Sequence, residues 1–191
     1  MITPDLTSVL EGNVWKGSVD VAKLIEKDKM AAIEIDKEDF NLIWLDKFAF
    51  TDGIIEFDAK GKSTPIQGSF VGIAFRVVDE NTYDAIYFRP FNFQSPDEER
   101  RLHAVQYVSL PAWPWYRLRR ERSGQYEKPI NPALDGDQWF RVKIVIRNRR
   151  INVFVNDAEE PALTLTELSD RNGGSVGLWC FGYGVISNVR C

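Results

Sequence analysis

GSFVGIAFRVVDENTYDAIYFRP, from Gly68 to Pro90, contains two runs in which apolar side chains recur at every second position. A period of two residues is typical of a β-strand that buries one of its faces. The polar link between the runs, VDENTY, predicts a hairpin connection. We therefore expect two antiparallel neighbouring strands, with core-facing side chains at Val71, Ile73, Phe75, Val77, Ile86 and Phe88.

The opposite face of this hairpin combines small residues with a few large polar ones. Glycine and alanine leave space beside Arg76, Tyr87 and Arg89, and strand pairing would place these three side chains on one sheet surface. Planar hydrogen-bond donors next to an aromatic ring suit a polyhydroxylated ligand. The hairpin therefore predicts a carbohydrate-binding face. The alternative for Arg89 is an ion pair with Glu56 or Glu127.

The same period of two residues continues from Met30 to the C-terminus. It occurs in about ten short runs separated by turn-forming residues such as Asp52-Gly53 and Asn172-Gly173-Gly174, a pattern typical of an all-β sandwich or barrel. Residues 1–29 are less regular. A short helix is expected within residues 18–29, with Val19 or Val21, Leu24 and Ile25 on its apolar face.

Length and composition favour one domain that spans residues 1–191 and has enough apolar material for a core, since 44% of the residues are hydrophobic. The 24 basic side chains are outnumbered by 28 acidic ones, which argues against nucleic acid as a partner. No apolar run approaches the roughly 18 residues of a membrane span. The N-terminus lacks the features of a signal peptide, so we expect a cytoplasmic protein, or a periplasmic or secreted one if a leader was trimmed.

The two cysteines, Cys180 and Cys191, are expected to be free thiols. We expect Gly182-Tyr183-Gly184 to form the turn of a terminal hairpin with Cys180 opposite Ile186. Cys191 would then lie too far along the strand for a disulfide, which requires Cα atoms within about 7 Å.

Residues 111–137 interrupt the strand pattern with a long insertion, and long insertions in compact domains often carry function. A helix is expected at residues 113–123. Trp113 and Trp115 in this segment, and Trp179 beside Gly177 on a later strand, are candidate stacking platforms for a sugar ring. His103 and Gln106 precede the insertion and add hydrogen-bonding groups to the candidate ligand site.

A retaining glycosidase would need two carboxyl groups about 5 to 5.5 Å apart. Glu56 and Asp58 share one strand face, and Glu127 lies in the insertion, so these three are candidate catalytic residues. The alternative is that Glu56 and Asp58 belong to a polar outer face. With His103 as the only histidine and no cysteine pair at ligand spacing, we expect no metal site apart from a possible calcium site at Asp79, Glu80 and Asp84, and no other cofactor.

The strand order, together with FVGIAFR, YDAIYFRPFNF, AVQYVS and the closing WFRVKIVIRNRRINVFVND and GSVGLWC, resembles the concanavalin A-like lectin and glucanase jelly rolls over residues 30–191. The likeness is strongest to bacterial domains grouped with the 3-keto-disaccharide hydrolase-like proteins, often labelled glycosyl hydrolases. Laminin G-like modules share the general strand pattern. The resemblance implies two curved antiparallel sheets with a concave face that receives a saccharide in many relatives.

Three functions are open from the sequence. The first is a domain that binds an oligosaccharide or polysaccharide on its concave face. The second is a glycoside hydrolase acting on a bacterial or plant saccharide. The third is a non-catalytic module in which the outer aromatic residues meet a protein partner; a flat apolar patch would favour it, whereas an open pocket with converging polar groups would favour the other two.

Overall fold

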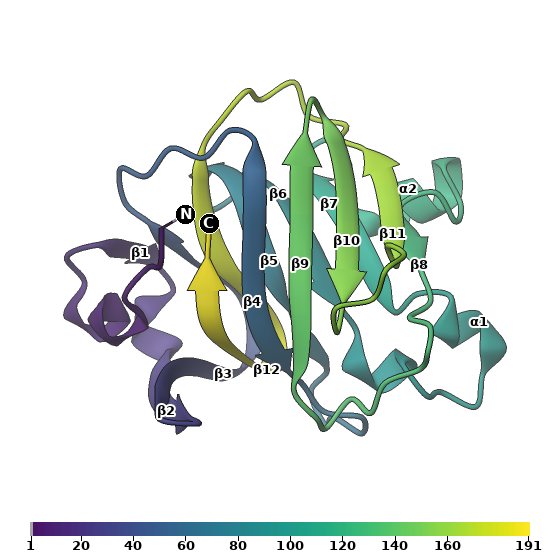
Figure 1. Ribbon diagram of the computed structural model, residues 1–191, viewed down its shortest axis with the longest axis horizontal. Helices are drawn as coiled ribbons and strands as arrows, with labels where there is room; N and C mark the ends of the chain where they lie inside the picture. Colours follow the sequence, from purple (N-terminus) through teal and green to yellow (C-terminus); the bar gives the residue numbers. More distant parts are fainter. Residues whose placement is uncertain (1) are drawn as a thin grey trace.

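The computed structural model describes residues 2–191 as an antiparallel β-sandwich, which confirms the all-β prediction. In Figure 1, β4, β9, β10 and β11 form the near sheet, and β5, β6 and β7 pass behind it. The strands are β1 (Trp15–Gly17), β2 (Lys23–Lys27), β3 (Met30–Leu45), β4 (Gly53–Lys60), β5 (Ser69–Asp79), β6 (Thr82–Phe88), β7 (Val105–Leu110), β8 (Glu127–Lys128), β9 (Phe140–Arg147), β10 (Arg150–Val155), β11 (Leu163–Thr166) and β12 (Ser175–Arg190). The helices are α1 (Glu98–Arg101), α2 (Trp115–Glu121) and short 3-10 turns at Leu6–Glu11, Val19–Val21 and Pro90–Asn92.

The hydrophobic core lies between the two sheets. The alternating side chains of β5 and β6 face it as expected, and Val71, Ile73 and Ile86 are fully buried. The ring of Phe88 on β6 meets the ring of Phe140 on β9 at 5.2 Å between centroids. Because neighbours along a strand point to opposite faces, Tyr87 must point away from the core, to the outer face of the sheet that contains β5 to β8.

The long strand β12 belongs to both sheets. Its first half pairs with β5 and its second half with β4, while β3 runs beside it over both halves. The change of sheet occurs near Gly182, whose φ of 69° lies in the left-handed region and whose position offers no room for a side chain, since a Cβ there would lie 2.2 Å from the Gly68 carbonyl oxygen. The expected terminal hairpin at residues 182–184 was therefore wrong: the glycines allow a bulge within one continuous strand.

The N-terminal segment also differs from its prediction. Residues 18–29 form only a short 3-10 turn at Val19–Val21, and the expected longer helix is replaced by β2, which pairs with the start of β3, with Lys27 opposite Met30. Asp28 and Lys29 at the turn both have positive φ, as a tight two-residue hairpin loop requires. The expected helix in the insertion is confirmed as α2, over residues 115–121.

Both thiols are free, as expected, and Cys180 is buried in the core. Burial raises the pKa of the Cys180 thiol well above its ordinary value. We expect a thiol reagent at pH 8 to leave Cys180 unmodified in the native protein and to modify both cysteines in denaturant. Native-state modification of Cys180 as fast as in denaturant would contradict this packing.

Candidate functional site

The candidate site lies on the outer face of the sheet formed by β5 to β8 and the first half of β12. Backbone pairing places Trp179, Gly72, Tyr87, Gln106 and Glu127 side by side in one row across five strands. Gly72 has no room for a side chain, because a Cβ there would lie 2.1 Å from the Ile86 carbonyl oxygen. The rings of Tyr87 and Trp179 stack across this glycine at 4.4 Å. The row therefore runs from an aromatic end to a polar end.

Arg89 holds the polar end together. Its guanidinium donates hydrogen bonds to the carbonyl oxygen of His103 at 3.0 Å, to Tyr87 Oη at 3.0 Å and to Gln106 Oε1 at 3.4 Å. Burial lowers the pKa of Arg89, and burial raises the pKa of Tyr87 to about 12. The guanidinium carries a charge in a largely dry setting, where its electrostatic effect on a ligand is stronger than in water.

Glu127 supplies the negative charge at this end, and its side chain is only 4% exposed. Both of its oxygens accept hydrogen bonds from Arg119 on α2, at 3.0 and 2.7 Å, in a bidentate pair. Nη1 of Arg89 lies 4.0 Å from the same carboxylate. The alternative that Glu127 pairs with Arg89 is thus partly realised, with Arg119 as the stronger partner.

His103 also contacts Glu127, with 2.8 Å between its Nδ1 and the carboxylate Oε2. Nδ1 makes no well-aligned hydrogen bond with that oxygen, so the contact is close but poorly aligned. Burial lowers the pKa of His103; the Glu127 carboxylate opposes this shift, and the charges of Arg119 and Arg89 add to it. His103 is therefore neutral near pH 7 and able to accept a proton.

A pocket of about 370 Å³ opens beside this polar cluster. Its lining combines aromatic rings with basic side chains and includes no carboxylate among residues 2–191. Asn92 is buried in the lining: its Nδ2 donates to the His103 carbonyl oxygen, whereas its Oδ1 has no partner. The residues that line the pocket are Phe40, Phe70, Tyr87, Arg89, Phe91, Asn92, Arg100, His103, Trp115, Arg119, Trp179 and Phe181.

Five sequence-predicted ligand residues meet here. Tyr87, Arg89, His103, Trp115 and Trp179 line the pocket, and Gln106 lies buried beneath it. Trp179 is less accessible than a stacking platform would be, because its ring is packed on Tyr87 and its indole N–H donates to Tyr83 Oη at 3.0 Å.

Trp115 is 42% exposed and is the more accessible ring. Trp113 lies outside the lining, where Arg117 and Arg122 pack on its ring.

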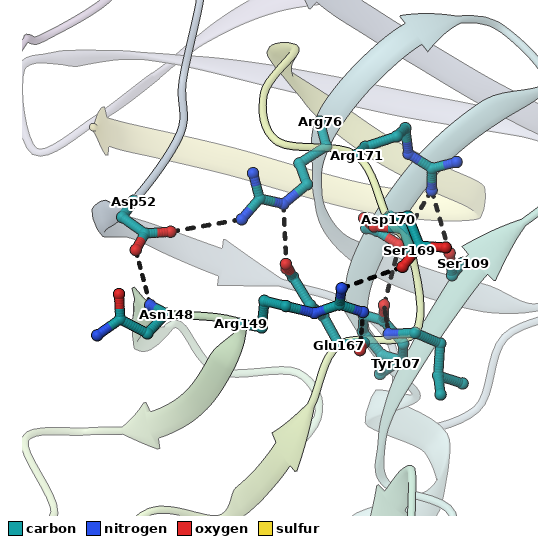
Figure 2. A network of polar contacts seen from close by, with 12 residues as sticks. Asp52, Arg76, Tyr107, Ser109, Asn148, Arg149, Glu167, Ser169, Asp170 and Arg171 are labelled. Carbon is teal, nitrogen blue, oxygen red and sulfur yellow. Dashed lines mark hydrogen bonds and ion pairs between the residues drawn. The ribbon is translucent and has the colours of Figure 1, made fainter.

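Arg76 does not share this surface, contrary to expectation. A bulge with φ of 52° at Arg76 interrupts the alternation of β5 and turns its side chain to the core side. There its Nε donates to Glu167 at 3.0 Å, and its Nη2 lies 3.4 Å from Asp52, as Figure 2 shows. Arg76 therefore belongs to a network that joins the two sheets at one end of the sandwich.

The strand pair Glu56 and Asp58 lies on β4, in the other sheet, and does not reach the pocket. Asp58 pairs with Lys27 at 2.5 Å and with Arg141 at 3.5 Å, and Glu56 lies opposite Lys143 in the backbone register. Glu127 is the one candidate carboxylate at the site. A pair of carboxyl groups facing each other across the pocket is not present among the described residues.

The candidate calcium ligands do not assemble. Asp84 is fully buried and accepts hydrogen bonds from Tyr107, Ser169 and Arg171. Within residues 2–191, no three His, Cys, Asp or Glu side chains are placed to hold a metal ion together.

Sequence reasoning missed several of the lining residues. Phe40 and Phe181 lie opposite each other on β3 and β12, and only the pairing of strands distant in sequence could have joined them to Phe70. In the sequence, nothing distinguished Arg119 from the other arginines of the expected helix. Asn92 sits in a 3-10 turn directly after Arg89, and its position in YFRPFNF was the available signal.

Residues 7–182 match the family described as the 3-keto-alpha-glucoside-1,2-lyase-like domain. The chain belongs to this family. The match confirms the resemblance that the sequence motifs indicated. No curated protein matches the sequence of this 3-keto-alpha-glucoside-1,2-lyase-like domain.

Solved structures confirm a concanavalin A-like jelly roll for this lyase-like domain. The carbohydrate-binding module CBM66 from Bacillus subtilis is similar with a TM-score of 0.61 at 14% identity, covering 93% of this chain and 95% of the module. The Bacillus licheniformis β-glucanase has a TM-score of 0.58 at 10% identity, covering 93% of this chain and 91% of the enzyme. The Emp46p carbohydrate recognition domain has a TM-score of 0.61 at 10% identity, covering 97% of this chain and 92% of that domain.

Among residues 2–191, no helix has the length and apolar character needed to span a bilayer.

The lowered pKa of His103 gives a testable pH dependence. As the only histidine, it should titrate in NMR spectra with a midpoint below its ordinary value of 6.5. The folded state then binds fewer protons than the unfolded state between the two pKa values, so stability should fall as the pH drops below about 6.5. A midpoint above 6.5 would contradict the dominance of burial over the Glu127 charge.

Proposed function

We propose that the outer-face pocket binds a saccharide. The observation that carries the proposal is the convergence of hydrogen-bonding groups from Arg89, Asn92 and His103 on a pocket whose other walls are aromatic. The arginines would donate to ring or hydroxyl oxygens, and the unpaired Oδ1 of Asn92, which is buried behind the pocket surface, would accept a hydrogen bond from a hydroxyl that displaces the atoms covering it. The exposed ring of Trp115 suits the apolar C–H face of a pyranose ring. The similarity in fold to a carbohydrate-binding module and a carbohydrate recognition domain agrees with this function.

The pair Trp115 and Tyr116 offers a matched test of this proposal. Both rings are exposed at the start of α2, but only Trp115 lines the pocket. On a glycan array followed by calorimetry, we expect affinities in the micromolar to millimolar range. The change Trp115→Ala should weaken binding by about 1 to 2 kcal/mol, or roughly 5- to 30-fold in Kd.

The change Tyr116→Ala is the control and should leave the affinity as it is. Equal effects of the two changes, or binding that neither affects, would place the saccharide elsewhere on the molecule.

A second candidate function is elimination from a 3-keto saccharide, as the family description names, and His103 is the observation that favours it. A ketone at C3 acidifies the proton on C2. A base can remove that proton while the C–H electron pair forms the C1–C2 double bond, and the C1–O bond breaks with its electron pair leaving on the oxygen, which takes up a proton. In this reaction His103, which lies beside Glu127 and has a lowered pKa, would act as the base, and Arg89 would stabilise the charge that develops on the ketone oxygen.

This reaction needs one base and not the two facing carboxylates of a retaining glycosidase. The test is release of the leaving alcohol from a 3-keto glucoside, followed by chromatography. The change His103→Gln should abolish release but only weaken binding of the unoxidised glucoside, because glutamine keeps a hydrogen-bonding group at this position. Release at the native rate by this variant would remove His103 from the reaction.

A further inference from the structure

Four phenylalanine side chains form a continuous part of the pocket lining. Phe40 on β3, Phe181 on β12 and Phe70 on β5 are direct neighbours across three strands. Each ring contacts the next one across the strands. The ring centroids are 5.1 Å apart for Phe40 and Phe181 and 5.5 Å apart for Phe181 and Phe70. Phe91, which follows Arg89 in the chain, adds a fourth ring against Phe70 at 5.2 Å. We call these four residues the phenylalanine wall.

The phenylalanine wall meets the polar cluster at Arg89, whose guanidinium carbon lies 5.7 Å from the centroid of the Phe70 ring, and extends away from it over β12 to Phe40 on β3. All of the charged and amide side chains of the lining come from residues 89–119, on the side of β6 to β8, whereas the wall spans β3, β12 and β5, with Phe91 added from the turn after β6. The stacked rings of Tyr87 and Trp179 join the two groups, since Tyr87 accepts a hydrogen bond from Arg89 and Trp179 contacts Phe40 with ring centroids 5.9 Å apart. A ligand that fills the pocket therefore meets polar groups at one end and apolar rings at the other.

A second sugar does not match the phenylalanine end. Its hydroxyl groups would lose water against phenylalanine, which offers no hydrogen bond in return, and a desolvated hydroxyl without a partner costs free energy. A flat apolar group would instead replace water on the rings and gain from edge and face contacts between aromatic systems. Phe40 is 62% exposed and is the ring with the most surface left to cover.

We propose that the phenylalanine wall is an aglycone subsite, so that the ligand is a glycoside whose non-sugar part is an aromatic ring and not a second saccharide. The inference rests on the proposed saccharide function, since the sugar would occupy the polar end. The phenylalanine wall would then determine which groups attached to the sugar the site accepts. Arg89, Asn92 and His103 would bind the sugar itself.

The test compares matched pairs of ligands by calorimetry: methyl and phenyl β-D-glucopyranoside, methyl and phenyl α-D-glucopyranoside, and phenol alone. We expect at least one phenyl glucoside to bind roughly 10-fold more tightly than its methyl partner. In Phe40→Ser this ratio should fall toward one. The exposed Val78 on β5 lies outside the pocket, so Val78→Ser is the control and should keep the native ratio.

The outcomes separate the two proposals. Equal affinity of methyl and phenyl glucosides, or a ratio that survives Phe40→Ser, overturns the aglycone subsite and leaves the saccharide site standing. Phenol that binds as tightly as the phenyl glucosides overturns the saccharide function, as does a failure of every glucoside to bind. A change of oligomeric state on gel filtration of Phe40→Ser, with no change in the ratio, would make the wall an interface between copies of the chain and would also overturn the inference.

Discussion

Replacing Glu127 with glutamine is expected to lower the free energy of unfolding by about 3 kcal/mol, because the change leaves the buried Arg89 and the partly buried Arg119 without their counter-ion. Glu127 accepts hydrogen bonds from Arg119 and lies 2.8 Å from His103 Nδ1 and 4.0 Å from Arg89 Nη1. Glutamine keeps the volume of the side chain, so the loss reports the charge and not a cavity. The melting temperature should fall by roughly 6 to 12 °C, and urea denaturation should give the free energy directly.

The NMR midpoint of His103 should also fall in Glu127→Gln, since the carboxylate is the main group that raises the pKa of this histidine. A control is available on the same helix that carries Arg119. Glu121 pairs with Arg117 and Arg120 at the surface, and Glu121→Gln should cost less than about 1 kcal/mol. If the two variants are equally stable, Glu127 does not hold the cluster together.

Replacing Arg76 with alanine is expected to cost about 3 kcal/mol of stability while leaving saccharide binding by the folded protein intact. The side chain of Arg76 is buried and pairs with Glu167, which is also buried (Figure 2). Burial already raises the pKa of Glu167, and Arg76 opposes that shift. Without the guanidinium, the carboxylate must lose its charge or draw in water, and either costs free energy.

Asp170 provides the matched control for Arg76. It pairs with Arg149 in the same region, but its side chain is 95% exposed, so Asp170→Ala should change the stability by no more than about 0.5 kcal/mol. Stability is measured by urea denaturation and binding by calorimetry below the melting temperature. If the Arg76→Ala protein is as stable as the native one but no longer binds saccharide, Arg76 belongs to the ligand site after all.

Most of the sandwich could be predicted because the period of two residues depends on local sequence. The core-facing sides of β5 and β6 follow directly from Val71, Ile73 and Ile86, and the same alternation sends Tyr87 and Arg89 outward. The prediction failed where the backbone leaves the regular strand geometry. Positive φ at Arg76 turns its side chain to the other face, and positive φ at Gly182 continues a strand where a turn was expected.

The candidate site was predictable only in part, because its two sides are assembled by pairing between distant segments. Tyr87 lies on β6 and Arg89 directly follows it, in a segment that the sequence marks clearly as a strand. Glu127 reaches them only because β8 pairs with β7, and Phe40 reaches Phe181 only because β3 runs beside β12. Neither pairing leaves a local pattern in the sequence.

The most direct test of the saccharide site is a crystal structure of the protein with a saccharide that binds in the titrations. The account predicts a sugar ring on the outer face of the β5 to β8 sheet, within hydrogen-bond distance of Arg89 and Asn92 and beside the ring of Trp115. A sugar ordered on the β4 to β11 sheet near Asp58, with the pocket at Arg89 empty, would contradict it.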